Sequence, residues 1–152
     1  MNFSTFYSTL FNIGYFPKAP GTAGTFVAAL VYFLLPESMF ISAACWIFFL
    51  LIVLILSIIS VHFISKAEKV LGHDNGKIII DEFFGYFFSV LFLPKTILII
   101  IGSFLLFRFF DILKPEPVNI LQKLPEGWGV MADDVMAGIY ANLILQILVR
   151  IF

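Results

Sequence analysis

The sequence predicts an all-helical integral membrane bundle, formed by one membrane-embedded domain over residues 1–152. Three observations predict it: 61% of the residues are hydrophobic, only 12% are charged, and the charged residues gather in islands between long apolar runs. Soluble domains carry roughly 25% charged residues, and so short a chain has too little interior to hide this much apolar surface. Nine Lys and Arg residues stand against ten Asp and Glu, so no basic excess indicates a nucleic-acid partner.

About five membrane helices are expected, some of them short. The first is bounded by Pro20-Gly21 and Pro36, and the second lies in the uncharged run 38–65. Only this second run exceeds the ~20 residues that a helix needs to cross the hydrocarbon core comfortably. The expected helices are 22–35, 39–63, 78–93, 96–112 and 131–150.

The third and fourth helices depend on how Pro94-Lys95 is interpreted. One kinked span over 83–107 would place Lys95 near the bilayer centre, at a cost of roughly 2.5–3.5 kcal/mol or more. A helical hairpin that turns at Pro94-Lys95 avoids this cost, because proline suits a turn and lysine can reach the headgroups. We therefore expect the hairpin.

The basic residues predict the orientation of this bundle. The five-helix arrangement puts seven Lys and Arg residues on one side and two, Lys95 and Arg150, on the other. The positive-inside rule then places the larger set in the cytoplasm. That set comprises Lys18, Lys66, Lys69, Lys77, Arg108, Lys114 and Lys123.

Three acidic clusters on the same side carry the candidate chemistry. Carboxylates in or beside an apolar span are costly and persist mostly where they pair, bind ions or line a site. Acidic pairs at helix starts can converge on Mg²⁺, which prefers oxygen ligands and substrate phosphates. The clusters are Asp81-Glu82, Asp111 between Arg108 and Lys114, and Asp133-Asp134.

Basic residues and a glycine-rich helix start supply candidate phosphate-binding groups. Arg108 offers a planar fork and Lys114 a point charge to phosphate oxygens. The helix that begins near Gly21 and Thr22 can offer free backbone N–H groups to an anion. Lys18, in the preceding loop, is a further candidate for binding the headgroup.

Each candidate also has a structural interpretation. The acidic pairs could stabilise helix N-termini, and Asp111 could only pair with Arg108 one turn away. Thr22 could serve as an N-cap, and Lys18 could be a positive-inside anchor.

Glycine spacing suggests that two acidic helices pack together. Gly85 follows Asp81 by four residues, and Gly138 follows Asp134 by four. A glycine one turn from a carboxylate lies on the same face and lets a neighbouring backbone approach. The carboxylates of both helices would then meet.

The residues also limit the mechanism of a phosphatase. Cys45 lies in an apolar run without a CxxxxxR pattern, no DxDx[TV] element is present, and His62 and His73 are not paired with Arg and Lys motifs. Cysteinyl-phosphate, haloacid-type and histidine-nucleophile routes are therefore not expected. Metal-assisted hydrolysis remains.

Four motifs in register resemble the phosphatidylglycerophosphatase A family. They are PKAPGTAGT at 17–25, DEFFG at 81–85, FRFFDILKPEP at 107–117 and GWGVMADDVMAG at 127–138. The resemblance implies an Mg²⁺-dependent enzyme of the bacterial inner membrane, with multiple spans and a site facing the cytoplasm. Its substrate would be the phospholipid phosphatidylglycerophosphate, which it would hydrolyse to phosphatidylglycerol and phosphate.

This resemblance, together with the clusters, defines the expected site. The expected catalytic residues are Asp81, Glu82, Asp111, Asp133 and Asp134, all but Asp111 also serving as metal ligands. Substrate binding is expected from Lys18, Thr22, Arg108 and Lys114. Two alternatives stay open: a phosphotransferase acting on CDP-activated lipids, whose DGxxAR pattern is absent, and a non-enzymatic membrane subunit or small ion carrier.

Overall fold

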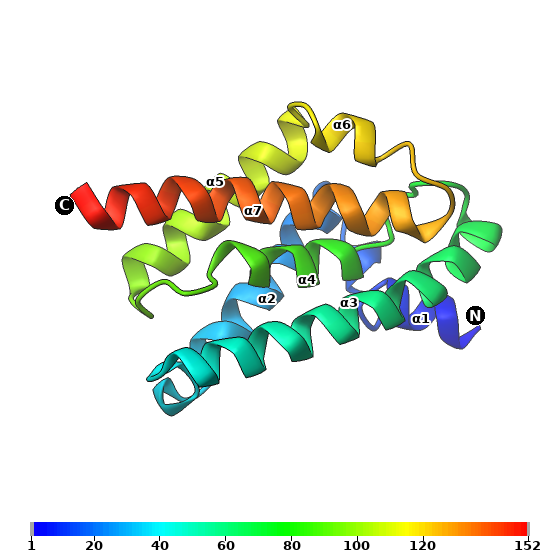
Figure 1. Ribbon diagram of the computed structural model, residues 1–152. Helices are drawn as coiled ribbons and strands as arrows, with labels where there is room; N and C mark the ends of the chain where they lie inside the picture. Colours follow the sequence, from blue (N-terminus) through cyan, green and yellow to red (C-terminus); the bar gives the residue numbers. More distant parts are fainter. Residues whose placement is uncertain (1, 152) are drawn as a thin grey trace.

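The computed structural model describes residues 2–151, and these residues contain helices but no strand. Short helices and single 3₁₀ turns connect five longer helices (Figure 1). The longer helices are α2 (Pro20–Leu34), α3 (Ala43–Leu71), α4 (Ile80–Ser89), α5 (Ile97–Leu113) and α7 (Gly127–Ile151). The connecting elements are α1 (Phe3–Ser8), η1 (Ile13–Tyr15), η2 (Glu37–Phe40) and α6 (Val118–Leu121). The all-helical prediction is confirmed.

The limits of three helices differ from the prediction. α2 begins at Pro20 with Ala19 at the N-cap position, because the fixed φ of proline suits a first helical turn. The N-cap interpretation of Thr22 is therefore wrong. α7 begins at Gly127, so Asp133-Asp134 lies inside the helix rather than at its start. α4 has only ten residues and is too short to cross a bilayer alone.

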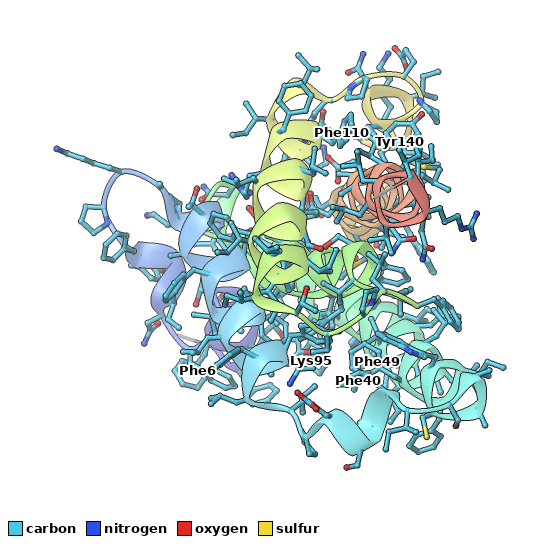
Figure 2. The ribbon with its side chains drawn as sticks, turned by 90° about the vertical axis from the view of Figure 1, so that its left-hand side faces the viewer. Phe6, Phe40, Phe49, Lys95, Phe110 and Tyr140 are labelled. Atoms are coloured by element: carbon cyan, nitrogen blue, oxygen red, sulfur yellow. The ribbon has the colours of Figure 1, made fainter. Side chains whose placement is uncertain are left out.

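The hairpin between α4 and α5 is present as predicted. Residues 90–96 separate the two helices, and Lys95 lies in this turn. Its ammonium group donates hydrogen bonds to the carbonyl oxygens of Phe33 (2.9 Å) and Leu35 (2.5 Å). These bonds satisfy carbonyl groups where α2 ends, and Figure 2 shows Lys95 near Phe40 at this end of the bundle.

The helices bring the expected charged regions to one end of the bundle. α2, α4 and α7 begin toward this end, while α3 and α5 finish there (Figure 1). The amide of Gly127 donates to the hydroxyl of Ser65 over 3.1 Å, which joins the start of α7 to the last third of α3. Lys95 and Arg150 lie at the opposite end.

The outer surface of the bundle is apolar. α3 and α7 are each long and apolar enough to cross a membrane. Large hydrophobic side chains on α3 point outward, among them Phe48, Ile55 and Ile58, which are 62%, 55% and 49% exposed. A surface of this kind suits lipid better than water, so a membrane-associated helical bundle is consistent with the structure.

Two glycines let α4 and α7 pack closely. A Cβ atom added to Gly85 would lie 2.9 Å from the Cβ of Asp134, and one added to Gly138 would collide with the carbonyl oxygen of Gly85. Small residues permit such backbone contact between helices in membranes. The predicted pairing of the two acidic helices is confirmed.

We expect Gly138→Ala to destabilise the fold. Its new methyl group would meet the backbone of α4, and overpacking of this kind costs about 1–3 kcal/mol. The matched control is Gly102→Ala, where the nearest atom is the flexible Cδ2 of Leu145 at 3.2 Å. Thermal unfolding in detergent should show a lower Tm for Gly138→Ala alone. Equal Tm values for the two variants would contradict a close α4–α7 contact.

Candidate active site

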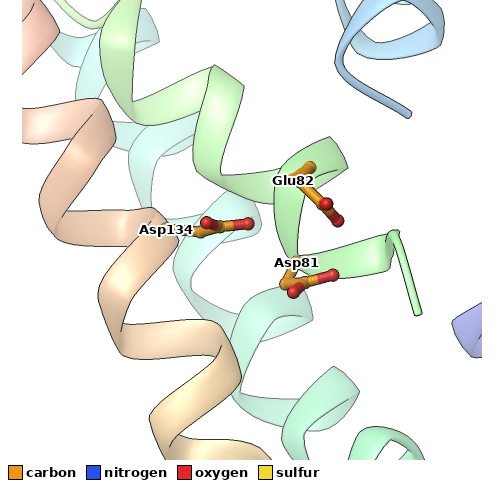
Figure 3. A group of neighbouring side chains, drawn as sticks. All are labelled: Asp81, Glu82 and Asp134. Carbon is orange, nitrogen blue, oxygen red and sulfur yellow. The ribbon is translucent and has the colours of Figure 1, made fainter. Parts of the chain in front are cut away.

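Three carboxylates meet where α4 lies against α7. Asp81 and Glu82 come from the first turn of α4, and Asp134 is the eighth residue of α7 (Figure 3). Each offers an oxygen, and these oxygens all lie within 4.8 Å of one another. Asp81 and Asp134 are only 6% and 3% exposed. We call Asp81, Glu82 and Asp134 the carboxylate cluster.

Every member of the carboxylate cluster has an unsatisfied oxygen. Within residues 2–151, Oδ1 of Asp81, Oε2 of Glu82 and Oδ2 of Asp134 are buried without a hydrogen-bond partner. Buried polar atoms without partners are costly and call for an explanation such as a bound ion. A set of oxygen ligands alone matches the preference of Mg²⁺. The residues present therefore fit a divalent cation of this kind.

Arg108 is the cation beside the cluster. Its Nη1 donates to Oδ2 of Asp111 and lies 4.0 Å from Oε1 of Glu82, while its Nε is buried without a partner in the described chain. The i, i+3 pairing with Asp111 matches the structural interpretation of that residue. It also orients the guanidinium group beside the carboxylate cluster.

The start of α2 packs against Glu82 and Arg108. A Cβ atom added to Gly21 would collide with Oε1 of Glu82 and lie 3.0 Å from Nη1 of Arg108. The N–H groups of Gly21 and Thr22 lie in the first turn, where no carbonyl group of the helix itself can accept them. Together with Arg108, this helix start has the donors of an anion site.

Lys114 and Asp133 form a second ion pair next to the cluster. Lys114 occupies the C-cap of α5, and its ammonium group donates to Oδ2 of Asp133. Burial alone would lower the pKa of Lys114, but the hydrogen bond to Asp133 and the surrounding carboxylates raise it above its usual value. Lys114 therefore stays charged at neutral pH and offsets the charge of Asp133.

The site brings together most of the residues predicted from the sequence. Three of the four expected metal ligands form the carboxylate cluster, while Asp133 faces Lys114 instead. Lys18 is exposed in the loop before α2, at a φ of 78°, and its expected role stays a prediction.

Two of the contacts in the site were not predicted from the sequence. One is the contact of Gly21 with Glu82 and Arg108. The Pro-Gly-Thr sequence indicated that a helix begins at this position, but not which side chains this helix start would meet. The pairing of Lys114 with Asp133 had no sequence signal, because the residues are 19 positions apart. Near the same end, Gln122 donates to Asp74, and the Nδ1 of His73 lies 2.6 Å from Glu68.

These features define a class of protein: an apolar helical bundle with a buried acidic site and adjoining cationic side chains at one end. The family model described as Phosphatidylglycerophosphatase A matches residues 6–149. The chain belongs to the phosphatidylglycerophosphatase A family.

Curated relatives agree with this assignment. The chain is 35% identical over 144 residues to phosphatidylglycerophosphatase A of Haemophilus influenzae, covering 89% of this chain and 82% of the relative. The Escherichia coli protein of the same name is 30% identical over 138 residues, covering 89% and 77%. A Bacteroides thetaiotaomicron protein named "Putative phosphatidylinositol-3-phosphatase" is 35% identical over 146 residues, covering 91% and 89%. No solved structure gives a significant match.

Family membership confirms that the chain is an enzyme, a phosphatase. The alternatives of a phosphotransferase and a non-enzymatic ion carrier are therefore set aside.

We expect Gly21→Ala to reduce activity much more than stability. The new methyl group would displace only the ends of the Glu82 and Arg108 side chains, so the helices need not move. A misplacement of about 1 Å in an active site can cost about 100-fold in rate. Phosphate release from a lipid phosphomonoester should fall by about that factor, with an unchanged Tm.

The control for this variant is Gly76→Ala, where an added Cβ atom meets nothing within 4 Å. It should retain wild-type activity. Full activity of Gly21→Ala would contradict a role in catalysis for the Glu82 and Arg108 side chains that Gly21 contacts.

Proposed function

We propose that this enzyme removes the terminal phosphate of phosphatidylglycerophosphate in a reaction that depends on Mg²⁺. The single observation that carries the proposal is the carboxylate cluster, with three unsatisfied buried oxygens beside a partly unsatisfied arginine. The H. influenzae and E. coli relatives named phosphatidylglycerophosphatase A support this substrate. Products would be phosphatidylglycerol and inorganic phosphate.

The proposed reaction is the hydrolysis of a phosphomonoester. Water attacks phosphorus, the bond from phosphorus to the glycerol oxygen breaks, and a proton from the water ends on that oxygen. Asp81, Glu82 and Asp134 would hold Mg²⁺. When bound there, Mg²⁺ would polarise the phosphoryl oxygens and lower the pKa of a coordinated water.

The other residues bind and orient the phosphate group. Arg108 would hold two phosphoryl oxygens with its fork, since Asp111 and Glu82 fix its direction. The free amides of Gly21 and Thr22 would add donors at the start of α2. Lys114 holds Asp133 in an ion pair and keeps a positive charge near the phosphate, which favours a loose transition state.

We also propose that the chain crosses the inner membrane of a bacterium about five times, with the carboxylate cluster on the cytoplasmic side. α3 and α7 have the length and composition of spans. α2 and the α4–α5 hairpin would supply shorter segments. Seven Lys and Arg residues near the carboxylate end, against two at the opposite end, support this orientation.

The assay that tests this function is phosphate release by the purified protein in detergent, with Mg²⁺ and after EDTA. We expect turnover of phosphatidylglycerophosphate with Mg²⁺, its loss with EDTA and its recovery when Mg²⁺ is restored. Phosphatidylinositol 3-phosphate is the rival substrate, because one relative is named for it. Full turnover without divalent metal, or preference for this rival, would overturn the proposal.

The same assay includes variants of the cluster. Asp134→Asn and Glu82→Gln should each lower kcat by about 100-fold or more, because each removes a negative charge that would hold Mg²⁺ at the site. The matched control is Glu37→Gln, an exposed carboxylate in η2 at the far end of the bundle. It should keep its activity.

A further inference from the structure

An apolar groove of about 330 Å³ runs between α2 and α5. All of the side chains that line it are apolar, and several are about half exposed, including Leu30 (46%) and Ile101 (51%). Figure 2 shows these two helices side by side. The groove residues used below are Phe26, Leu30 and Phe33 from α2 with Ile97, Ile101 and Phe104 from α5.

The groove leads to the active site at one end. Thr22 precedes Phe26 by four residues, and Arg108 follows Phe104 by four. Residues four apart lie on the same face of a helix, about 6 Å along its axis. The two faces that line the groove therefore continue into the start of α2 and into Arg108. The contact of Gly21 with Arg108 joins the helices there.

Because the groove continues to Arg108, the kind of lipid that it would bind can be inferred. An apolar groove on a membrane protein can be covered by any lipid, but a cation at its end favours a lipid with an anionic phosphate group. The face of α2 from Phe26 to Phe33 is about 10 Å long. Half of the hydrocarbon core is about 15 Å thick, so the groove would cover about two thirds of one acyl chain in a leaflet.

We infer that the groove between α2 and α5 binds an acyl chain of the phospholipid substrate while its terminal phosphate lies at Arg108. The inference rests on the proposed function and adds a binding site for the lipid tail. The substrate would enter sideways from the bilayer between these helices. Burial of its chain would contribute to KM rather than to the chemical step.

A second apolar groove provides a control. It has a volume of about 270 Å³ and lies mainly between α3 and α7, where Ile58 and Ile139 are among its lining residues. The carboxylates of α7 project elsewhere, since Asp134 faces Gly85 of α4 and Asp133 pairs with Lys114. This groove does not lead to Arg108, so filling it should not affect binding of the substrate chain.

The experiment compares Leu30→Trp and Ile101→Trp with the control Ile58→Trp, whose side chain is similarly exposed at 49%. Each variant is assayed with Mg²⁺ on dioleoyl and dihexanoyl phosphatidylglycerophosphate. The readout is the ratio of KM for the long-chain substrate to KM for the short-chain substrate. We expect this ratio to rise about tenfold in the two groove variants and to stay at the wild-type value in Ile58→Trp.

Each other outcome has a defined meaning. An unchanged ratio in both groove variants, with wild-type enzyme active, would overturn the groove while leaving the proposed function intact. Equal losses on both substrates in both groove variants would also overturn it, because the groove would then be only a structural contact. A wild-type enzyme inactive on both substrates would reject the proposed function, and the groove with it.

Discussion

The close contact between α4 and α7 is the constraint on which the site depends. Gly85 and Gly138 remove the side chains that would hold the two backbones apart. Only at this separation can Asp134 of α7 reach the Asp81 and Glu82 carboxylates of α4. The remaining parts of the site, the start of α2 and the end of α5, are arranged around this pair of helices.

This contact concentrates negative charge in an apolar protein. Five carboxylates gather near two cationic groups. Asp111 and Asp133 pair closely with Arg108 and Lys114, and Glu82 lies 4.0 Å from Arg108. The cluster of Asp81, Glu82 and Asp134 keeps unsatisfied oxygens instead. Such an arrangement is poor for stability, because buried charge needs compensation. It would suit the proposed reaction, in which a metal ion would supply the remaining positive charge and Arg108 would bind the phosphate.

Much of this architecture could be predicted from the sequence, because apolar runs indicate membrane helices, prolines indicate turns, and groups of charged residues indicate the ends of the helices. The Pro94-Lys95 turn and the Gly85 and Gly138 contact were predicted for physical reasons that the structure confirms. The start of α7 was predicted four residues too late, because Gly127 and Gly129 have low helix propensity. In the structure, tertiary contacts such as the hydrogen bond from Gly127 to Ser65 stabilise the helical conformation of this first turn. The pairing of Lys114 with Asp133 and the contact of Gly21 with Glu82 and Arg108 depend on tertiary packing. The Pro-Gly-Thr pattern marks the helix start but does not encode which side chains it meets.

The most direct measurement of the central claim is metal binding by the purified protein, without substrate or turnover. Titration with Mn²⁺, followed by the EPR signal of the free ion, would count bound metal, and Mg²⁺ would be the competitor. The account predicts saturable binding that Mg²⁺ displaces, its loss in Asp81→Asn and Asp134→Asn, and its retention in Glu37→Gln. Wild-type binding in Asp134→Asn, or no saturable binding in the unmodified enzyme, would contradict the account.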